Sequence, residues 1–315
     1  MLIQLGYELL FQVPARTPML LMLYTHPSQA TALRTVDWIR VEPDTFVEVF
    51  TDPFGNYCGR LVAAPGPLRL WSTTLIEDSG MPDLVSPDTP QQPVEELPSS
   101  VLPFLLGSRY CEVDKLTEVA WSLFGQTPPG WPRAQAVCDW VHNNVRFGYE
   151  FANLFKSASD VYRERTGVCR DLNHLALTFC RCLGIPARYA TGYLGDIGVP
   201  ASPAPMDFSG WFEAYLGGQW HTFDARHNTP RVGRVVMARG RDAVDVALTT
   251  SFGPTTLVKF VVYTNEVRAP YQTGGGMATA PFAHGVGRDV RLADGGVFLP
   301  GVTVGNPPSI HSMRQ

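Results

Sequence analysis

The sequence lacks the features that mark several common classes of protein. It has no block of basic residues, and 25 Lys and Arg against 29 Asp and Glu give a net charge of −4, which argues against nucleic-acid binding. No apolar run reaches the ~18 residues that a membrane-spanning helix requires. Residues 1–16 are interrupted by polar side chains and lack the charged-then-apolar layout of a secretory signal. We therefore expect no nucleic-acid or membrane partner, and a cytoplasmic location.

Signals for cofactors and metals are absent as well. No glycine-rich phosphate loop or dinucleotide fingerprint occurs, and the spacing of Asp and Glu forms no calcium loop. The six cysteines, at 58, 111, 138, 169, 180 and 182, include no C-x-x-C pair, and a zinc site would require paired Cys and His spacings. We predict no cofactor and no metal. Five of the six cysteines are expected to be buried, reduced thiols.

The remaining cysteine, Cys169, stands at the predicted start of a helix. A Thr-Gly-Val segment precedes it, and the apolar run at 175–182 ends at a Gly-Ile-Pro segment, so the pattern predicts a helix over about 169–183. The helix dipole and the unpaired N–H groups of a first turn stabilise a thiolate. We therefore expect a thiol pKa below the ordinary ~8.5 and interpret Cys169 as a candidate nucleophile.

The character of the sequence changes twice along the chain, and 45% of its residues are hydrophobic, enough for a packed core. Residues 2–76 alternate in short segments between turn signals, as is typical of a β-sandwich. Helical patterns and then antiparallel strands follow a Pro-, Asp- and Ser-rich linker. We predict an α+β protein with an N-terminal β-sandwich domain and linker (1–100), a catalytic core with an antiparallel sheet (101–268) and a Gly/Pro-rich tail (269–315).

A hairpin signal downstream of the cysteine helix brings two polar residues together. With Gly217-Gly218 as a two-residue turn, Tyr215 opposes Trp220. Strand parity then places seven residues on one face: Ser209, Trp211, Glu213, Tyr215, Trp220, Thr222 and Asp224. A cysteine nucleophile needs a group that takes its proton and a carboxylate that orients this group. Ser209 and Asp224 are therefore expected to point at a common neighbour.

Five segments resemble the core of transglutaminase-like proteins, in the same order and at similar spacing, over about residues 110–230. They are Gly-Val-Cys-Arg-Asp (167–171), Gly-Ile-Pro-Ala-Arg-Tyr (184–189), Thr-Gly-Tyr (191–193), Trp-Phe-Glu-Ala-Tyr-Leu (211–216) and Trp-His-Thr-Phe-Asp (220–224). The resemblance implies a papain-like cysteine-enzyme core behind a β-rich domain, as in bacterial members. It also implies that Cys169 is the nucleophile and Asp224 the orienting acid.

One position departs from the family pattern. A His-Ala pair usually precedes the Trp of the first hairpin strand, and here this pair is Ser209-Gly210. We predict a catalytic set of Cys169, Ser209 and Asp224, in which the hydroxyl relays a proton or positions a water or an amine, and Asp224 supplies the basicity. Such a site suits activated acyl groups better than unactivated amides. Two other interpretations remain open: addition of Cys169 to a different electrophile, and a silent site.

Another histidine could also supply the base. His227 lies just past the end of the second hairpin strand, where a bend would return it to the site, and it is the main alternative. His221 faces the other way by strand parity, and His174 lies about 140° around the helix from Cys169. His142 ends a helix, where a cation is favoured.

The sequence thus predicts cysteine-dependent acyl transfer or hydrolysis through a thioacyl-enzyme on Cys169. The substrate is expected to be a peptide amide or an activated acyl group, a thioester or ester, free or bound to a carrier or protein. The alternative is a catalytically silent transglutaminase-like protein that acts as a binding partner or scaffold. The choice between water and amine as acceptor and the oligomeric state are left open.

Overall fold

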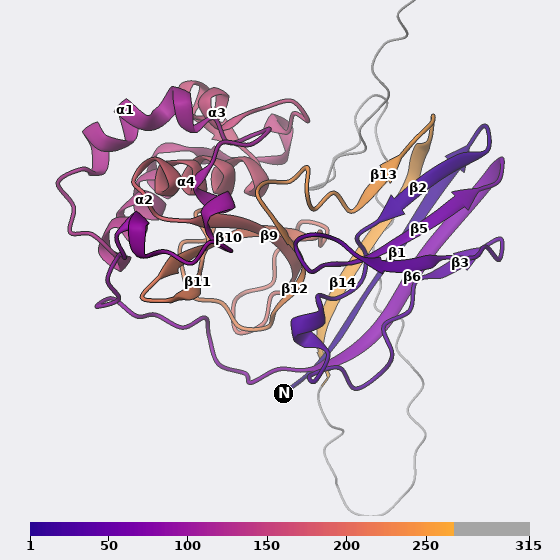
Figure 1. The fold of residues 1–315 in the computed structure, drawn as a ribbon. Helices are drawn as coiled ribbons and strands as arrows, with labels where there is room; N and C mark the ends of the chain where they lie inside the picture. Colours follow the sequence, from indigo (N-terminus) through magenta and orange to yellow (C-terminus); the bar gives the residue numbers. More distant parts are fainter. Residues whose placement is uncertain (268–315) are drawn as a thin grey trace, which may run out of the picture.

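Two units lie side by side in the computed structural model, which describes residues 1–267 (Figure 1). One unit is β-rich and carries the N-terminus, and the other combines helices α1 to α4 with an antiparallel sheet. This arrangement confirms the predicted α+β class with a β-rich N-terminal region. No helix within the described part is long and apolar enough to cross a membrane. The predicted tail, 269–315, lies outside the described residues.

The β-rich unit consists of two four-stranded antiparallel sheets, with the strand orders β14-β1-β6-β3 and β13-β2-β5-β4. The strands are β1 (Leu2–Val13), β2 (Thr17–Leu21), β3 (Arg40–Glu42), β4 (Glu48–Thr51), β5 (Tyr57–Ala63), β6 (Gly66–Glu77), β13 (Thr249–Ser251) and β14 (Thr256–Val267). Every second side chain of β6 is buried or nearly so, as a strand with one covered face requires. Both sheets contribute to one apolar core, to which β1 gives Leu9 and β5 gives Leu61. The two sheets therefore pack as a sandwich.

The last two strands return to the first two. β14 pairs with β1 from Leu2↔Val267 to Gln12↔Thr256, and β13 pairs with β2 at Thr249↔Leu21. The predicted domain boundaries place residues 249–267 in the catalytic core, whereas in the structure β13 and β14 belong to the sheets of the N-terminal unit. The reason is a non-local one: β14 covers the edge of β1 that β6 leaves open, and an uncovered edge would expose unpaired backbone groups.

The second unit is built around one buried helix. Every residue of α4 (Cys169–Cys182) is buried, and α1 (Val113–Phe124), α2 (Trp131–Asn144) and α3 (Ala158–Glu164) pack against it. The helix begins at Cys169, as predicted. Shorter elements are η1 (Pro27–Gln29), η2 (Val94–Glu96), η3 (Leu102–Leu105), η4 (Tyr149–Phe151) and the parallel pair β7 (Arg146–Phe147) and β8 (Thr166–Gly167).

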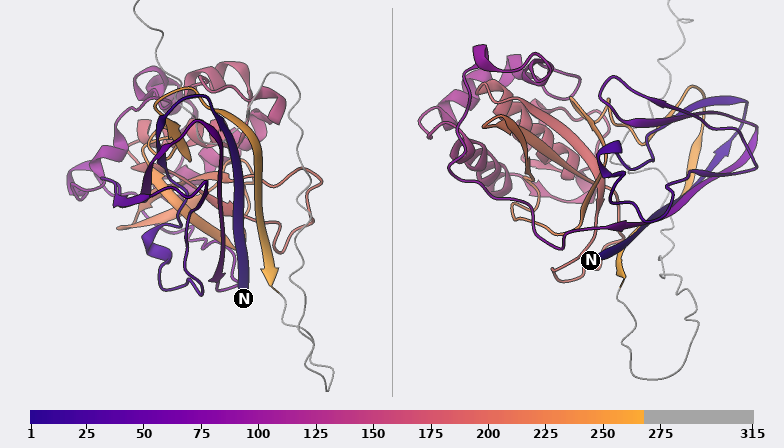
Figure 2. Two further views of the ribbon diagram at one scale, coloured as in Figure 1. Left: turned by 90° about the vertical axis from the view of Figure 1, so that its right-hand side faces the viewer. Right: turned by 60° about the horizontal axis from the view of Figure 1, so that its bottom comes forward.

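The core sheet separates α4 from the β-rich unit (Figures 1 and 2). Its order is β11-β10-β9-β12, with β9 (Ala187–Leu194), β10 (Ser209–Leu216), β11 (Gln219–Phe223) and β12 (Arg234–Gly240). On one face Phe212 and Phe223 join the apolar core of α4. On the other face Tyr193 and Met237 join the core of the sandwich. The two units therefore share their packing through this sheet.

The register of the β10–β11 hairpin agrees with the sequence prediction. Leu216 opposes Gln219 and Tyr215 opposes Trp220, across a turn in which Gly217 and Gly218 both have positive φ. Two-residue turns of this kind require positive φ at both positions, which glycine adopts without strain. The register fixes which residues reach the ends of the strands, where the cysteine lies.

Candidate active site

The first turn of α4 is held by a buried ion pair. Asp171 accepts a hydrogen bond from the Val168 N–H at 3.0 Å and pairs with Arg170 at 2.6 Å, and both charged side chains are almost fully buried. A Cβ at Gly167 would lie 2.7 Å from the Cβ of Asp171, so this close approach requires glycine. The cap satisfies a backbone donor that a helix start would otherwise leave unpaired. It fixes the position of Cys169.

The sulfur of Cys169 lies in the interior, and the residue is 3% exposed. Burial raises the pKa of the thiol above its ordinary value, the Arg226 guanidinium and the backbone N–H of Gly210 lower it, and the carboxylates of Asp207 and Asp224 raise it. The predicted low thiol pKa is therefore wrong in direction, because desolvation outweighs the helix start. A thiol of this kind is protonated at neutral pH and needs a base before it can attack.

Asp224 follows β11 and is surrounded by donors. Its Oδ1 accepts from the backbone N–H groups of Arg226 and His227 at 3.0 and 3.3 Å. Its Oδ2 lies 2.8 Å from Nδ1 of His227 and 3.3 Å from the Arg234 guanidinium. Burial acts to raise the pKa of this carboxyl, but His227 and Arg234 outweigh it and hold the pKa well below its usual range. Asp224 therefore stays ionised and is a weak base.

Ser209 opens β10 and is buried. Its backbone carbonyl accepts from Thr191 Oγ1 at 3.1 Å, whereas its own Oγ makes no hydrogen bond to any described residue. Its neighbour Gly210 directs a backbone N–H at the sulfur, which brings this end of β10 next to Cys169. The predicted relay from the thiol through the Ser209 hydroxyl to Asp224 has no hydrogen bond in this structure.

Unpartnered polar atoms gather around the cysteine. Within residues 1–267, Oγ of Ser209, Oδ1 of Asp207 and Oη of Tyr189 are all buried without a hydrogen-bond partner. Asp207 and Tyr189 both interact electrostatically with Cys169, and a Cβ at Gly210 would lie 2.1 Å from the Tyr189 oxygen. A buried polar group without a partner is costly and uncommon. Their concentration here is typical of a site that receives a substrate.

Of the histidines considered as a base, one contacts Asp224 and the other three do not. His221 faces away from Asp224 and packs against a tryptophan ring, and His174 lies between two tyrosine rings. His142 lies at 3.0 Å from a carbonyl of the turn after β11. His227 is the histidine that the structure brings to Asp224, in the His–carboxylate arrangement that orients an imidazole.

Comparisons with known proteins agree on the family. Residues 119–225 match the sequence model of the transglutaminase-like superfamily. The crystal structure of a candidate cysteine protease from Cytophaga hutchinsonii is 30% identical, with a TM-score of 0.73 over 86% of this chain and 92% of that one. The chain belongs to the transglutaminase-like superfamily.

A curated relative of this transglutaminase-like chain is known only as an uncharacterized protein of Mycobacterium leprae. The two are 29% identical over 115 residues, which are 36% of this chain and 41% of the relative. The match therefore spans less than half of that relative's length. The superfamily assignment confirms the resemblance and the fold, and this fold typically carries cysteine-dependent acyl transfer or hydrolysis.

Sequence reasoning missed two charged residues of this transglutaminase-like site. Arg226 lies over the Phe147 ring at 4.1 Å and interacts with both Cys169 and Tyr149. Asp207 lies in the loop before β10, two residues before its first residue. The sequence offered one signal for them, since each lies two residues from a predicted site residue. Because neither belongs to a periodic pattern, this position could not show that their side chains reach the cysteine.

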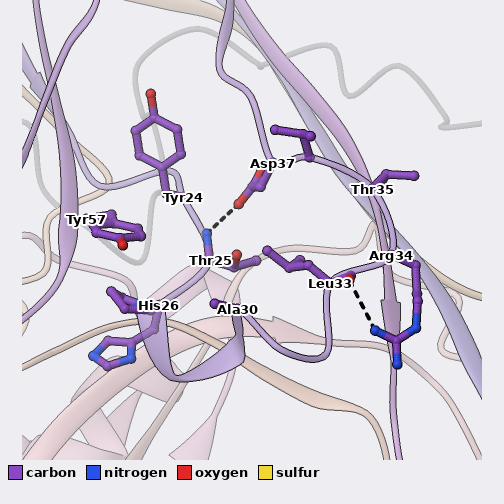
Figure 3. A pocket seen from close by; sticks show the side chains of 11 residues that line it. Tyr24, Thr25, His26, Ala30, Leu33, Arg34, Thr35, Asp37 and Tyr57 are labelled. Atoms are coloured by element: carbon purple, nitrogen blue, oxygen red, sulfur yellow. Dashed lines mark hydrogen bonds between the residues drawn. The ribbon is translucent and has the colours of Figure 1, made fainter.

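Two cavities of the transglutaminase-like chain lie apart from the sulfur. One of about 500 Å³ lies against the side of Asp224 and is bordered by Trp131 and Asn228. The other, of about 470 Å³, lies in the β-rich unit, where Thr25 donates its N–H to Asp37 (Figure 3). Cys169 lines neither of them. Among residues 1–267 no group of three or more His, Cys, Asp and Glu could hold a metal ion.

Proposed function

We propose that this chain is an enzyme that transfers or hydrolyses acyl groups through a thioacyl intermediate on Cys169. The observation that carries the proposal is the surroundings of the sulfur. Cys169 starts a fully buried helix, the N–H of Gly210 is directed at it, and unpartnered polar groups surround it. The carbonyl carbon of the substrate is attacked by sulfur, and the leaving amine, alcohol or thiol departs with a proton. Water or an amine then releases the acyl group.

The other predicted residues have distinct roles in this proposal. Ser209 donates its hydroxyl to the thiolate or to the bound acyl group, because its oxygen is buried and has no other described partner. The backbone N–H of Cys169 stabilises the oxyanion that forms during the attack. Asp224 is the charged anchor that orients His227 and, with Arg234, holds the turn beside the sulfur.

The favoured substrate is an activated acyl group rather than a stable amide. A thiolate or aryloxide leaves a tetrahedral intermediate readily, whereas an amine leaves only after it is protonated. Position 209 holds serine, which is a far weaker acid than the histidinium that donates this proton in a Cys-His-Asp site. We therefore expect thioesters and esters to acylate Cys169 faster than peptide amides do.

Intact-mass spectrometry tests the proposal. The protein is incubated with a small aryl ester, an alkyl thioester and an unstructured peptide, and adducts are located by peptide mapping. We expect one acyl group on Cys169 with the ester and the thioester, and none in Cys169→Ala. Cys58→Ala is the matched control, because Cys58 is also buried but belongs to the β-rich unit. If no substrate gives an adduct, or if Cys58 reacts equally, the silent scaffold is the better interpretation.

A further inference from the structure

Asp207 stands where the loop from β9 joins β10, two residues before Ser209. The residue keeps part of its surface at the solvent, but its Oδ1 is buried and has no hydrogen-bond partner among the described residues. An ionised carboxylate oxygen in such a place loses its hydration without replacement. Aspartate is therefore a costly choice here unless its lone pair has a use.

The groups that face Asp207 come from four elements. Cys169 lies at the start of α4, Tyr189 on β9, Tyr149 in η4 and Arg226 in the turn after β11, and each interacts electrostatically with the Asp207 carboxyl. The backbone N–H of Phe208 favours the charged form of the same carboxyl. Asp207 thus lies within electrostatic range of the thiol, without a hydrogen bond to the sulfur in this structure, and Arg226 can balance a negative charge on either group.

The other candidates for a base are weaker. Asp224 accepts hydrogen bonds from two backbone N–H groups and from the side chains of His227 and Arg234. Protonation of Asp224 would therefore break hydrogen bonds that the structure already contains. The Ser209 hydroxyl has a pKa far above neutrality. His227 gives its backbone N–H and its Nδ1 to Asp224, which leaves Nε2 as the one ring atom that could accept a proton, and within residues 1–267 no hydrogen bond joins this ring to Cys169.

We propose that Asp207 accepts the thiol proton of Cys169 and returns it to the leaving group, in place of the histidine that position 209 lacks. This inference rests on the proposed function. In the first step the S–H bond breaks and an O–H bond forms on Asp207, while sulfur forms a bond to the acyl carbon. When the intermediate collapses, the same proton passes to the leaving oxygen or sulfur of the activated acyl group. Asp207 is then ionised again, takes a proton from the attacking water or amine, and returns it to the sulfur when the C–S bond of the thioester breaks.

Charge and desolvation favour this assignment. Burial raises the pKa of Asp207 to about 7, with the Phe208 N–H and Arg226 opposing the rise. A base with a pKa near the working pH is the most effective one. Proton transfer also moves the negative charge to the sulfur, which lies near Arg226 and the Gly210 N–H, and it removes the Asp207 charge that disfavours the thiolate.

Alkylation of Cys169 by chloroacetamide tests the proton transfer without any substrate. In the wild type we expect the rate to rise in two steps between about pH 5 and 10, the first near 7, because the thiol and the carboxyl share one proton. Asp207→Asn should remove the first step and slow alkylation at pH 7 by at least about tenfold. Asp207→Glu should restore part of the alkylation rate at pH 7. Asp196→Asn, in the same loop but paired with Arg231, should match the wild type.

Acylation by the aryl ester is measured on the same variants. We expect Asp207→Asn to lower its rate by about 10²-fold, the smaller effect of a general base. If Asp207→Asn keeps both the pH profile and the acylation rate, the inference is wrong even though the enzyme is active. If His227→Gln removes the step near pH 7 instead, histidine is the base and the inference is wrong. If alkylation follows Asp207 but no substrate acylates Cys169, the proton transfer stands and the proposed function fails.

Discussion

Two carboxylates that both act on the Cys169 thiol differ in their hydrogen-bond partners. Asp224, after β11, has donors on both oxygens, and its pKa lies well below the usual range. Asp207, before β10, has an oxygen with no partner, and burial raises its pKa to about 7. Both are desolvated, so burial alone does not decide the charge state. Hydrogen-bond donors decide the charge state. Asp224, after β11, stays ionised, whereas Asp207, before β10, has a carboxyl that can exchange a proton.

The largest expected effect is on stability and concerns Asp224. Asp224→Asn removes the charge that pairs with the 6% exposed Arg234 side chain and with His227. We expect the free energy of unfolding to fall by about 3 kcal/mol, since an amide at this position leaves buried donors of the turn without an acceptor, although Arg234 keeps its ion pair with Asp83. Asp207→Asn should change it little or increase it at neutral pH, because it removes a charge without a hydrogen-bonded partner. Urea unfolding of both variants at pH 7.5 compares them, and equal losses would contradict the contrast.

The pH dependence of stability should separate the two groups next. The pKa of Asp207 is raised on folding, so the unfolded chain, with an ordinary pKa of ~3.9, releases this proton first. Its contribution is fully present below about pH 4 and is lost as pH rises to about 7, by roughly 2–4 kcal/mol. For Asp224 the sign is opposite, because its lowered pKa gives stability that is present above ~3.9 and is lost on acidification. The difference in unfolding free energy between the wild type and Asp207→Asn, followed by urea titration from pH 4 to 8, checks the first trend. A flat difference would show that Asp207 titrates normally.

A smaller effect is expected where β10 crowds the site. Alanine usually stands in the family where this chain has Gly210, and here its Cβ would lie 2.1 Å from the Tyr189 oxygen. We expect Gly210→Ala to cost about 1–3 kcal/mol by overpacking. Combining Tyr189→Phe with Gly210→Ala should recover part of this loss of stability, because it removes the Tyr189 oxygen, the atom closest to the new Cβ. Thermal unfolding of the two single variants and the double variant measures the coupling, and simple additivity would speak against this contact as the cause.

The smallest effect should follow changes at Ser209. Ser209→Ala removes a hydroxyl without a described partner, so stability should change by less than about 1 kcal/mol, whereas ester acylation should slow by about three- to tenfold. Ser209→His should increase hydrolysis of peptide amides, because an imidazolium can protonate a leaving amine. Acylation and amide-hydrolysis rates for the two variants test this. If both match the parent on every substrate, Ser209 has no part in the chemistry.

Local patterns were sufficient to predict much of the site. The apolar run and its Gly-Ile-Pro stop located α4, and the glycine pair fixed the register of the β10–β11 hairpin. Strand parity correctly separated Asp224 from His221. These predictions succeed because a helix start and a two-residue hairpin are determined by residues close in sequence.

The remaining features depend on contacts between distant segments. Asp207 follows a Pro/Gly-rich loop without periodicity, so nothing local shows that its carboxyl turns inward beside Cys169. The direction of the thiol pKa depends on complete burial, which is a tertiary property, and the helix start alone suggested the wrong sign. The partners of β13 and β14 lie more than two hundred residues away along the chain.

The return of β14 to β1 has a consequence for synthesis on the ribosome. The core unit is complete in sequence once β12 ends at Gly240, while β1 still lacks its outer neighbour until Thr256–Val267 has emerged. A nascent chain that pauses in between presents a twelve-residue strand with one bare edge, the kind of surface that recruits other strands. The cysteine unit is therefore expected to form first, and the sandwich to close around an already packed sheet. Chains shortened before Thr256 should aggregate during expression although Cys169, Asp207 and Asp224 are all present.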